Sequence, residues 1–149
     1  MSLKKTIEQG IKEAMLNKDK DRLRALRAIK SLILLAETEK GGQDELSEDT
    51  EMKLLTKAAK QRRDSIEIFE QQKRDDLAAT EKAELDVIES FLPKQLTEEE
   101  IEVEVKSVIE KVGAQGPQDM GKVMGMATKQ LAGKADGKLI SMLAKKLLS

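Results

Sequence analysis

The 149-residue sequence contains no cysteine and no histidine, and its only aromatic residues are two phenylalanines. Without cysteine the chain has neither disulfides nor thiolate chemistry, and without histidine it lacks the commonest general base and metal ligand. The scarcity of aromatic rings argues against recognition of single-stranded nucleic acid, which depends on base stacking. We therefore expect neither a metal site nor another cofactor.

Long apolar runs are also missing. No stretch approaches the length of a membrane span, and the first residues lack the apolar segment of a signal peptide. The sequence carries no phosphate loop, dinucleotide fingerprint or nucleophile–base pair. These absences predict a cytoplasmic protein without a membrane contact and give no sign of catalytic residues.

The residues that are abundant favour helices. Leucine, isoleucine, methionine, alanine, lysine and glutamate dominate, and they prefer helix to strand. Apolar residues recur at helical spacing, and Thr97 with Glu100 forms a capping box that opens one helix. We predict an all-α protein with helices at residues 3–16, 21–40, 47–73, 77–91, 97–112, 119–132 and 136–148, the second ending at Gly41-Gly42.

The turn at Pro93 predicts a domain boundary. A multihelical N-terminal array would occupy residues 1–93, and a small three-helix bundle would occupy residues 94–149. Charge changes along the same division. Residues 81–112 carry four Lys or Arg against ten Asp or Glu, whereas residues 113–149 carry six against two. The net charge of −1 therefore understates the local attraction of the C-terminal end for polyanions.

Two glycine-rich helix openings in that basic end predict anion binding. Asp119 and Asp136 stand at N-cap positions, and Lys122, Lys134 and Lys138 lie close by in the sequence. Backbone N–H groups and the positive end of a helix favour phosphate. Ordinary caps and tight turns would give the same pattern, so both interpretations stay open. The spacing of Gly121 and Gly125 further suggests that a neighbouring helix approaches closely there.

A second basic strip lies on the predicted helix at residues 21–40. Lys20, Arg24, Arg27 and Ser31 follow one another at 4-3-4 spacing and so share a narrow face. Such a strip can follow a phosphate backbone without reading its sequence. We take Arg24 and Arg27 as candidate RNA contacts, with a merely solvated face as the alternative.

Two charged residues interrupt apolar stripes. Arg62 falls in the seam of the third predicted helix, and Glu81 falls in the seam of the fourth. Charges that face inward are costly unless they are paired. We therefore predict a structural ion pair between Arg62 and Glu81, or between Arg62 and Glu84, across an antiparallel helix pair. An arginine stem reaching to solvent is the alternative.

Several segments together resemble the YqeY family over essentially the whole chain. They are Leu23–Lys30, Lys60–Ile66, Arg74–Leu77, Phe91–Leu96 and the two C-terminal glycine segments. The resemblance implies a helical array followed by a three-helix bundle. The sequence departs from the family at Lys73, where a glycine often precedes the arginine, and this predicts a tighter or slightly shifted turn.

The YqeY family is similar to the tail of the B subunit of the tRNA-dependent amidotransferase, which implies a role in holding tRNA. We therefore predict a non-catalytic module that binds folded RNA, most plausibly tRNA. A protein–protein interaction module, using the acidic residues 81–112 or the bundle, is the main alternative. The resemblance also allows a protein linked to carbon–nitrogen ligase activity with glutamine as amido donor, although no catalytic residue can be transferred.

Overall fold

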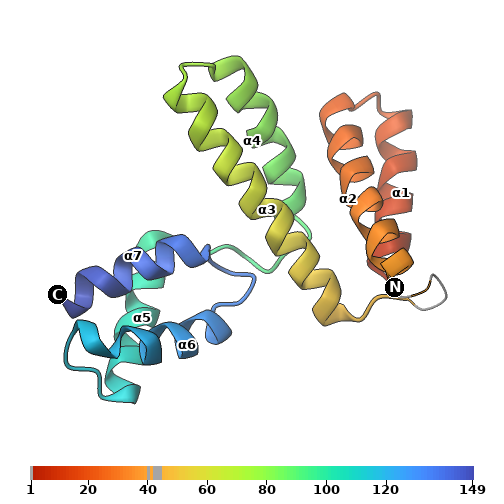
Figure 1. Ribbon diagram of the computed structural model, residues 1–149. Coiled ribbons are helices and arrows are strands. Elements are labelled where there is room, and N and C mark those ends of the chain that lie inside the picture. Colours follow the sequence, from red (N-terminus) through yellow and green to blue (C-terminus); the bar gives the residue numbers. More distant parts are fainter. Residues whose placement is uncertain (1, 40, 42–44) are drawn as a thin grey trace. The chain divides into compact units, whose positions relative to one another are not determined.

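Every regular element of the protein is helical within residues 2–39, 41 and 45–149, the part of the chain that the computed structural model describes. Seven α-helices and one short 3₁₀ helix follow one another there (Figure 1). They are α1 (Leu3–Leu16), α2 (Lys20–Glu39), α3 (Glu48–Gln71), α4 (Asp75–Glu89), α5 (Glu98–Val112), η1 (Pro117–Asp119), α6 (Met120–Gln130) and α7 (Gly137–Leu148). The predicted all-α fold is confirmed. Among these described helices, none is long and apolar enough to cross a membrane.

The helices gather into two compact units, Met1–Leu92 and Pro93–Ser149. Each unit has an apolar core of its own. The first unit contains α1 to α4, and the second contains η1 and α5 to α7.

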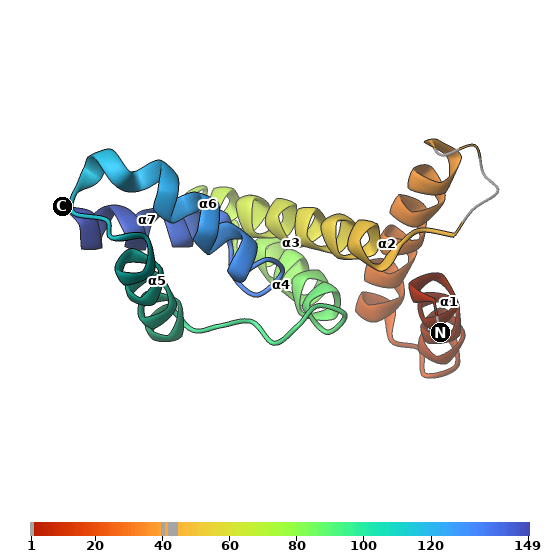
Figure 2. The same ribbon diagram turned by 90° about the horizontal axis from the view of Figure 1, so that it is seen from below.

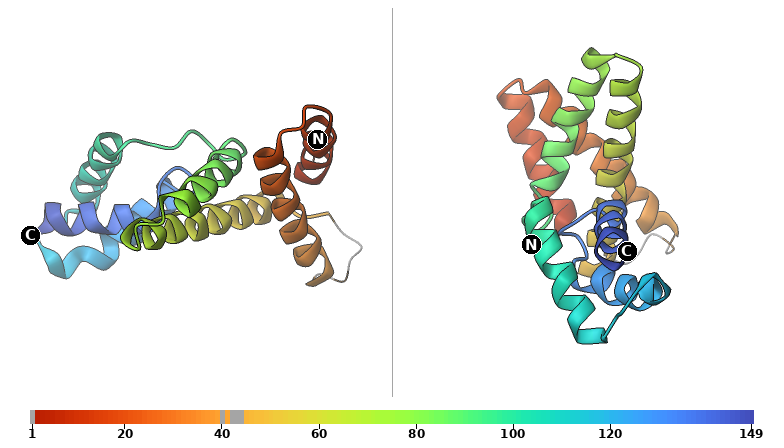
Figure 3. Two further views of the ribbon diagram at one scale, coloured as in Figure 1. Left: turned by 90° about the horizontal axis from the view of Figure 1, so that it is seen from above. Right: turned by 90° about the vertical axis from the view of Figure 1, so that its left-hand side faces the viewer.

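In the N-terminal unit, α3 and α4 form an antiparallel hairpin, and α1 packs against α2. Helix α2 contacts both helices of the hairpin and crosses them steeply (Figures 2 and 3). Leu26, Ile29 and Ile33 of α2 are spaced three or four residues apart and are buried, because they occupy one face of the helix. They pack with Leu55 of α3 and Ile88 of α4.

In the C-terminal unit, α5, α6 and α7 all contact one another in a three-helix bundle. Its core is wholly aliphatic, with Ile101, Val105, Val123 and Ile140 almost completely buried. Helices α6 and α7 run antiparallel (Figures 1 and 2). The predicted capping box is present: the Thr97 hydroxyl accepts from the backbone N–H of Glu100, whose carboxylate accepts from the N–H of Thr97.

Helices α1, α3 and α5 end in the same left-handed turn, and of these three only α5 has glycine there. Gly113 follows α5 with a φ of 67°, whereas Lys18 and Lys73 adopt 56° and 59° after α1 and α3. The N–H of Lys73 donates to the carbonyl of Glu70 at 3.0 Å, and the N–H of Arg74 donates to that of Phe69 at 2.8 Å. These two bonds form a Schellman motif.

The Schellman motif shows how the chain accommodates lysine at position 73, where the family often has glycine. Lys73 adopts the left-handed conformation expected of a glycine, with a φ of 59°. Helix α3 instead ends at Gln71, two residues before the predicted end at Lys73. The expected end of α2 at Lys40 and Gly42 lies outside the described residues.

Replacing Lys73 with glycine is expected to stabilise the N-terminal unit by about 1 kcal/mol. A side chain in the left-handed region costs roughly 1–2 kcal/mol, and glycine avoids that cost while losing some chain entropy. Chemical unfolding, followed through NMR signals of the unit, would measure the change. Lys60→Gly in the middle of α3 is the matched control and should destabilise by about 1 kcal/mol. Equal destabilisation by both substitutions would contradict the assignment of strain to Lys73.

Candidate nucleic-acid interface

Glu84 is the one charged residue among those described that is buried in the protein. Its side chain lies on α4 and is only 9% exposed. One carboxylate oxygen accepts a hydrogen bond from Nε of Arg24 on α2 at 2.6 Å. The other accepts from Nε of Arg62 on α3 at 2.8 Å. A single carboxylate therefore holds three helices together.

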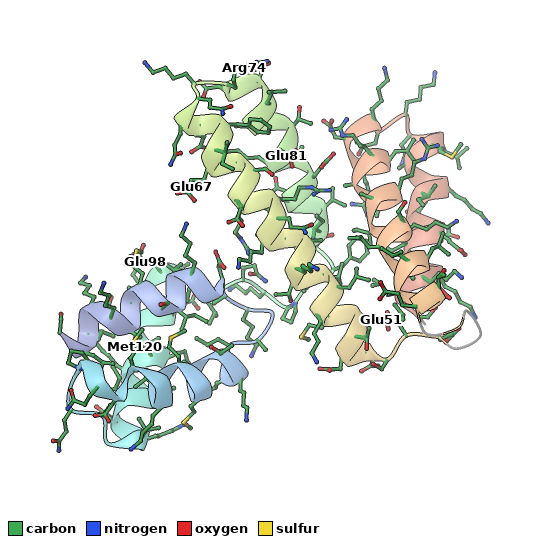
Figure 4. The ribbon with its side chains drawn as sticks, in the orientation of Figure 1. Glu51, Glu67, Arg74, Glu81, Glu98 and Met120 are labelled. Carbon is green, nitrogen blue, oxygen red and sulfur yellow. The ribbon has the colours of Figure 1, made fainter. Side chains whose placement is uncertain are left out.

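The structure brings the predicted pair Arg62 and Glu81 together, but at a longer distance. Nε of Arg62 lies 3.4 Å from Oε2 of Glu81, and this oxygen has no hydrogen-bond partner within the described residues. Figure 4 shows Glu81 on the stretch of α4 that runs beside α3. Glu84 lies three residues further along the same face of α4 and makes the closer contact. Arg62 thus sits between two carboxylates, and Glu84 is the principal partner.

Arg24, a candidate RNA contact, is already engaged. Its guanidinium donates to Glu84 and also to the Asp21 carboxylate at 2.7 Å. The hydrogen bond with Glu84, followed by that with Asp21, raises the pKa of Arg24 above its ordinary value. Arg27 is exposed, and no ion pair to it is found within the described ranges. Arg27 is therefore better placed than Arg24 to contact a phosphate.

The start of α6 differs from the expected N-cap. The Asp119 carboxylate accepts from the backbone N–H of Gln115 at 2.9 Å and makes no bond to the first turn of α6. Asp119 stands at the N-cap position, as predicted, but its side chain makes no capping bond, and the 3₁₀ helix at Pro117–Asp119 leads directly into α6. Asp119 instead closes the preceding turn.

The start of α7 matches the expected cap. Oδ1 of Asp136 accepts from the backbone N–H of Lys138 at 3.3 Å. The adjoining loop is fixed from the other side, since the N–H of Leu96 donates to the carbonyl of Lys134 at 2.9 Å. The Lys134 side chain is exposed above this fixed backbone.

The three candidate lysines of the C-terminal unit are exposed but do not form one compact site. Lys122 lies in the first turn of α6, whereas Lys134 and Lys138 lie around the start of α7. Because α6 and α7 are antiparallel neighbours, these two helix starts lie at opposite ends of the bundle (Figures 1 and 2). Over the 11 residues of α6 this amounts to about 16 Å along the axis. Lys122 and the other two lysines would have to contact separate phosphates.

Residues 113–149 carry three more exposed lysines, which were not singled out from the sequence. Lys129, Lys145 and Lys146 are exposed, like the three candidates. Both acidic residues of segment 113–149, Asp119 and Asp136, are engaged with backbone N–H groups. The excess of lysine in this segment was a signal that could have found all six.

The outer face of α6 carries two glycines without a tertiary neighbour. A Cβ atom on Gly121 or Gly125 would meet no atom within 4 Å across the described residues, apart from its own chain neighbours and helix backbone. The expected close approach of another helix is therefore not made within this chain. The same face includes the exposed Lys122, so backbone and lysine are both accessible there.

Comparison with known proteins confirms the resemblance drawn from the sequence. The profile of the family described as "Yqey-like protein" matches residues 4–148. The chain is 33% identical over 131 residues to a protein of Pyrenophora tritici-repentis, covering 87% of this chain and 71% of the relative. It is 32% identical over 134 residues to a protein of Candida glabrata, covering 88% and 69%. Both relatives are named "Altered inheritance of mitochondria protein 41, mitochondrial".

These names contradict the predicted cytoplasmic location. A Saccharomyces cerevisiae relative, 31% identical over 98 residues and matching 66% of this chain and 52% of its own length, carries the same mitochondrial name. The prediction rests on the lack of long apolar runs and of an apolar leader. Neither feature separates one compartment from another, because mitochondrial targeting segments are amphipathic rather than apolar. The inference was therefore wrong.

Removing the Glu84 carboxylate is expected to destabilise the N-terminal unit more than removing that of Glu81. Glu84→Ala leaves two guanidiniums without their main partner, which should cost about 2–3 kcal/mol, less than for a fully buried pair because Arg24 is 45% exposed. Glu81→Ala should cost below about 1 kcal/mol. Urea unfolding of the two variants measures the difference. The reverse order would show that Arg62 depends chiefly on Glu81.

Proposed function

Since the chain belongs to the YqeY-like family over residues 4–148, we propose that it is a helical module that binds folded RNA, with tRNA as the leading candidate. The observation that carries this proposal is the charge of α6, α7 and the loops beside them. All six lysines of residues 113–149 are exposed, and the two acidic residues there serve as backbone acceptors. This surface therefore carries an excess of positive charge, six lysines against two carboxylates.

The chemistry of the surface favours phosphate over bases. Lysine is a compact point charge on a flexible stem, which suits contact with a phosphate without fixed geometry. Residues 93–149 contain no aromatic side chain, so unpaired bases would find nothing to stack on. The lysines at the two ends of the bundle are about 16 Å apart along α6, and a folded RNA presents phosphates at such separations on a rigid surface. Folded RNA therefore fits better than a flexible single strand.

The N-terminal unit would add Arg27. Its side chain is exposed on α2 one turn away from Arg24, which the Glu84 carboxylate holds in place. Arg24 would then act mainly by fixing α2, and Arg27 would supply the charge. The similarity of the YqeY family to the tRNA-holding tail of the amidotransferase B subunit supports the same type of partner.

Helix α5 favours a second candidate function, contact with a basic protein. Val103 is 65% exposed on this helix, and Glu98 and Glu99 are exposed in its first turn. An apolar side chain near uncompensated carboxylates suits a partner of opposite charge. This surface is distinct from the lysines of α6 and α7, so RNA and protein contacts can be tested separately.

Replacing Lys122, Lys134 and Lys138 together with glutamine is expected to weaken tRNA binding roughly tenfold or more at low salt. It should also reduce the slope of log affinity against log salt by about 2, because three fewer counterions are released. Fluorescence anisotropy between about 50 and 200 mM salt would measure both quantities. Glutamine keeps the helix propensity of lysine, and circular dichroism checks that helix content is unchanged.

The matched control replaces Lys53, Lys57 and Lys60 of α3 with glutamine. The charge change is the same, but these residues lie in the acidic part of the chain, so tRNA affinity should change little. Folded tRNA should also compete better than an unstructured oligonucleotide of equal length. Absence of micromolar tRNA binding even at low salt would contradict the proposal, as would equal losses in the two triple variants.

A further inference from the structure

An open groove lies between the second half of α2 and the first half of α3 in the N-terminal unit. Its volume is about 320 Å³. Its apolar lining comes from both helices: Leu32, Leu35, Ala36, Leu54 and Ala58. Ala58 is the only one of these five that is buried, and Leu35 is 59% exposed. The groove is therefore an uncovered apolar surface and not an enclosed cavity.

The groove has a positive edge. Lys53 and Lys57 line it from α3, one helical turn apart, and both are exposed. Lys53 pairs with Asp49 at 3.1 Å, but both side chains are more than three-quarters exposed, so the pair is weak. Lys57 has no carboxylate within 4 Å in the described part of the chain. On the α2 side, Glu39 also lines the groove.

The dimensions match a short helix. On α3 the lining runs from Thr50 to Gln61, about 16 Å along the axis of that helix, and α2, which crosses the hairpin steeply (Figure 2), contributes lining residues from Leu32 to Glu39. Two or three turns of a partner helix would cover that length. Such a helix would place aliphatic side chains at i, i+3 or i+4, and i+7 against Leu32, Leu35 and Leu54.

We propose that this groove binds an amphipathic helix of a protein partner, one that carries carboxylates along the edge facing Lys53 and Lys57. Burial of the exposed leucine surface supplies the attraction, and the lysine edge sets the orientation of the helix. The groove belongs to the N-terminal unit and shares none of the lysines assigned to RNA. Peptide binding and RNA binding can therefore fail independently.

Two synthetic 16-residue helical peptides test the proposal. They share one leucine stripe and differ only in one flank, which is glutamate in the first and lysine in the second. NMR of the full ¹⁵N-labelled chain should show shifts at the amides of Leu35, Leu54 and Lys57 with the acidic peptide. The acidic peptide should bind at least tenfold more tightly than the basic one.

Matched variants assign the binding to the groove. Leu35→Gln, and separately Lys53→Glu with Lys57→Glu, should each weaken the acidic peptide at least tenfold, and the double reversal should favour the basic peptide. Leu16→Gln and Lys12→Glu alter exposed residues of α1 outside the groove and should leave binding unchanged. Circular dichroism confirms that each variant is folded, and tRNA affinity should be unaffected by Leu35→Gln.

Five results would overturn the proposal, and four of them come from the binding experiments. These four are equal affinity for the two peptides, shifts confined to other surfaces, equal losses in the α1 control variants, and shifts of the groove amides by tRNA instead of peptide. Self-association of the chain that Leu35→Gln abolishes would also overturn it, because the occupant would then be a second copy. Loss of tRNA binding in the lysine variants of α6 and α7 would have no bearing on this groove.

Discussion

The arrangement of the N-terminal unit depends on the carboxylate of Glu84. A buried charge is tolerated only when it is paired and hydrogen-bonded, and Glu84 meets this condition with two guanidiniums at once. Arg24 lies 60 residues away in the sequence and Arg62 lies 22 residues away. Both bonds form together only when α2, α3 and α4 meet around this carboxylate. The interaction therefore fixes the position of α2 on the hairpin, as a purely apolar contact would not.

Charged side chains play no part in the core of the C-terminal unit. Its core contains aliphatic side chains without a buried charge, and the starts of α5 and α7 are set by local caps. Because no lysine of α6 or α7 is needed in the core, all of them remain at the surface. Charge thus has a different role in each of the two units. In the first unit it contributes to helix packing, and in the second it lies at the surface.

The two proposed contacts are likewise divided between the N-terminal and the C-terminal unit. The lysines of α6 and α7 suit the phosphates of a folded RNA, since they are mobile point charges without aromatic neighbours. The groove between α2 and α3 suits a protein helix, since it offers apolar surface with charge at one edge only. A module with both surfaces would bring an RNA and a protein together on one chain. Membership of the YqeY-like family accounts for the fold, whereas the two contacts are inferred from the charge and shape of the surfaces.

Local signals in the sequence determined the helices. The periodic apolar residues of α2, the Thr97–Glu100 capping box and the cap at Asp136 depend on neighbours within about one turn, so the sequence alone predicted them. Three features were decided by the tertiary structure alone. Glu84 is the main partner of Arg62, and Arg24 is held by the same carboxylate. Lys122 and Lys138 lie at opposite ends of the bundle. Each of these outcomes depends on how helices distant in sequence cross and on their direction, which the spacing within one helix does not specify.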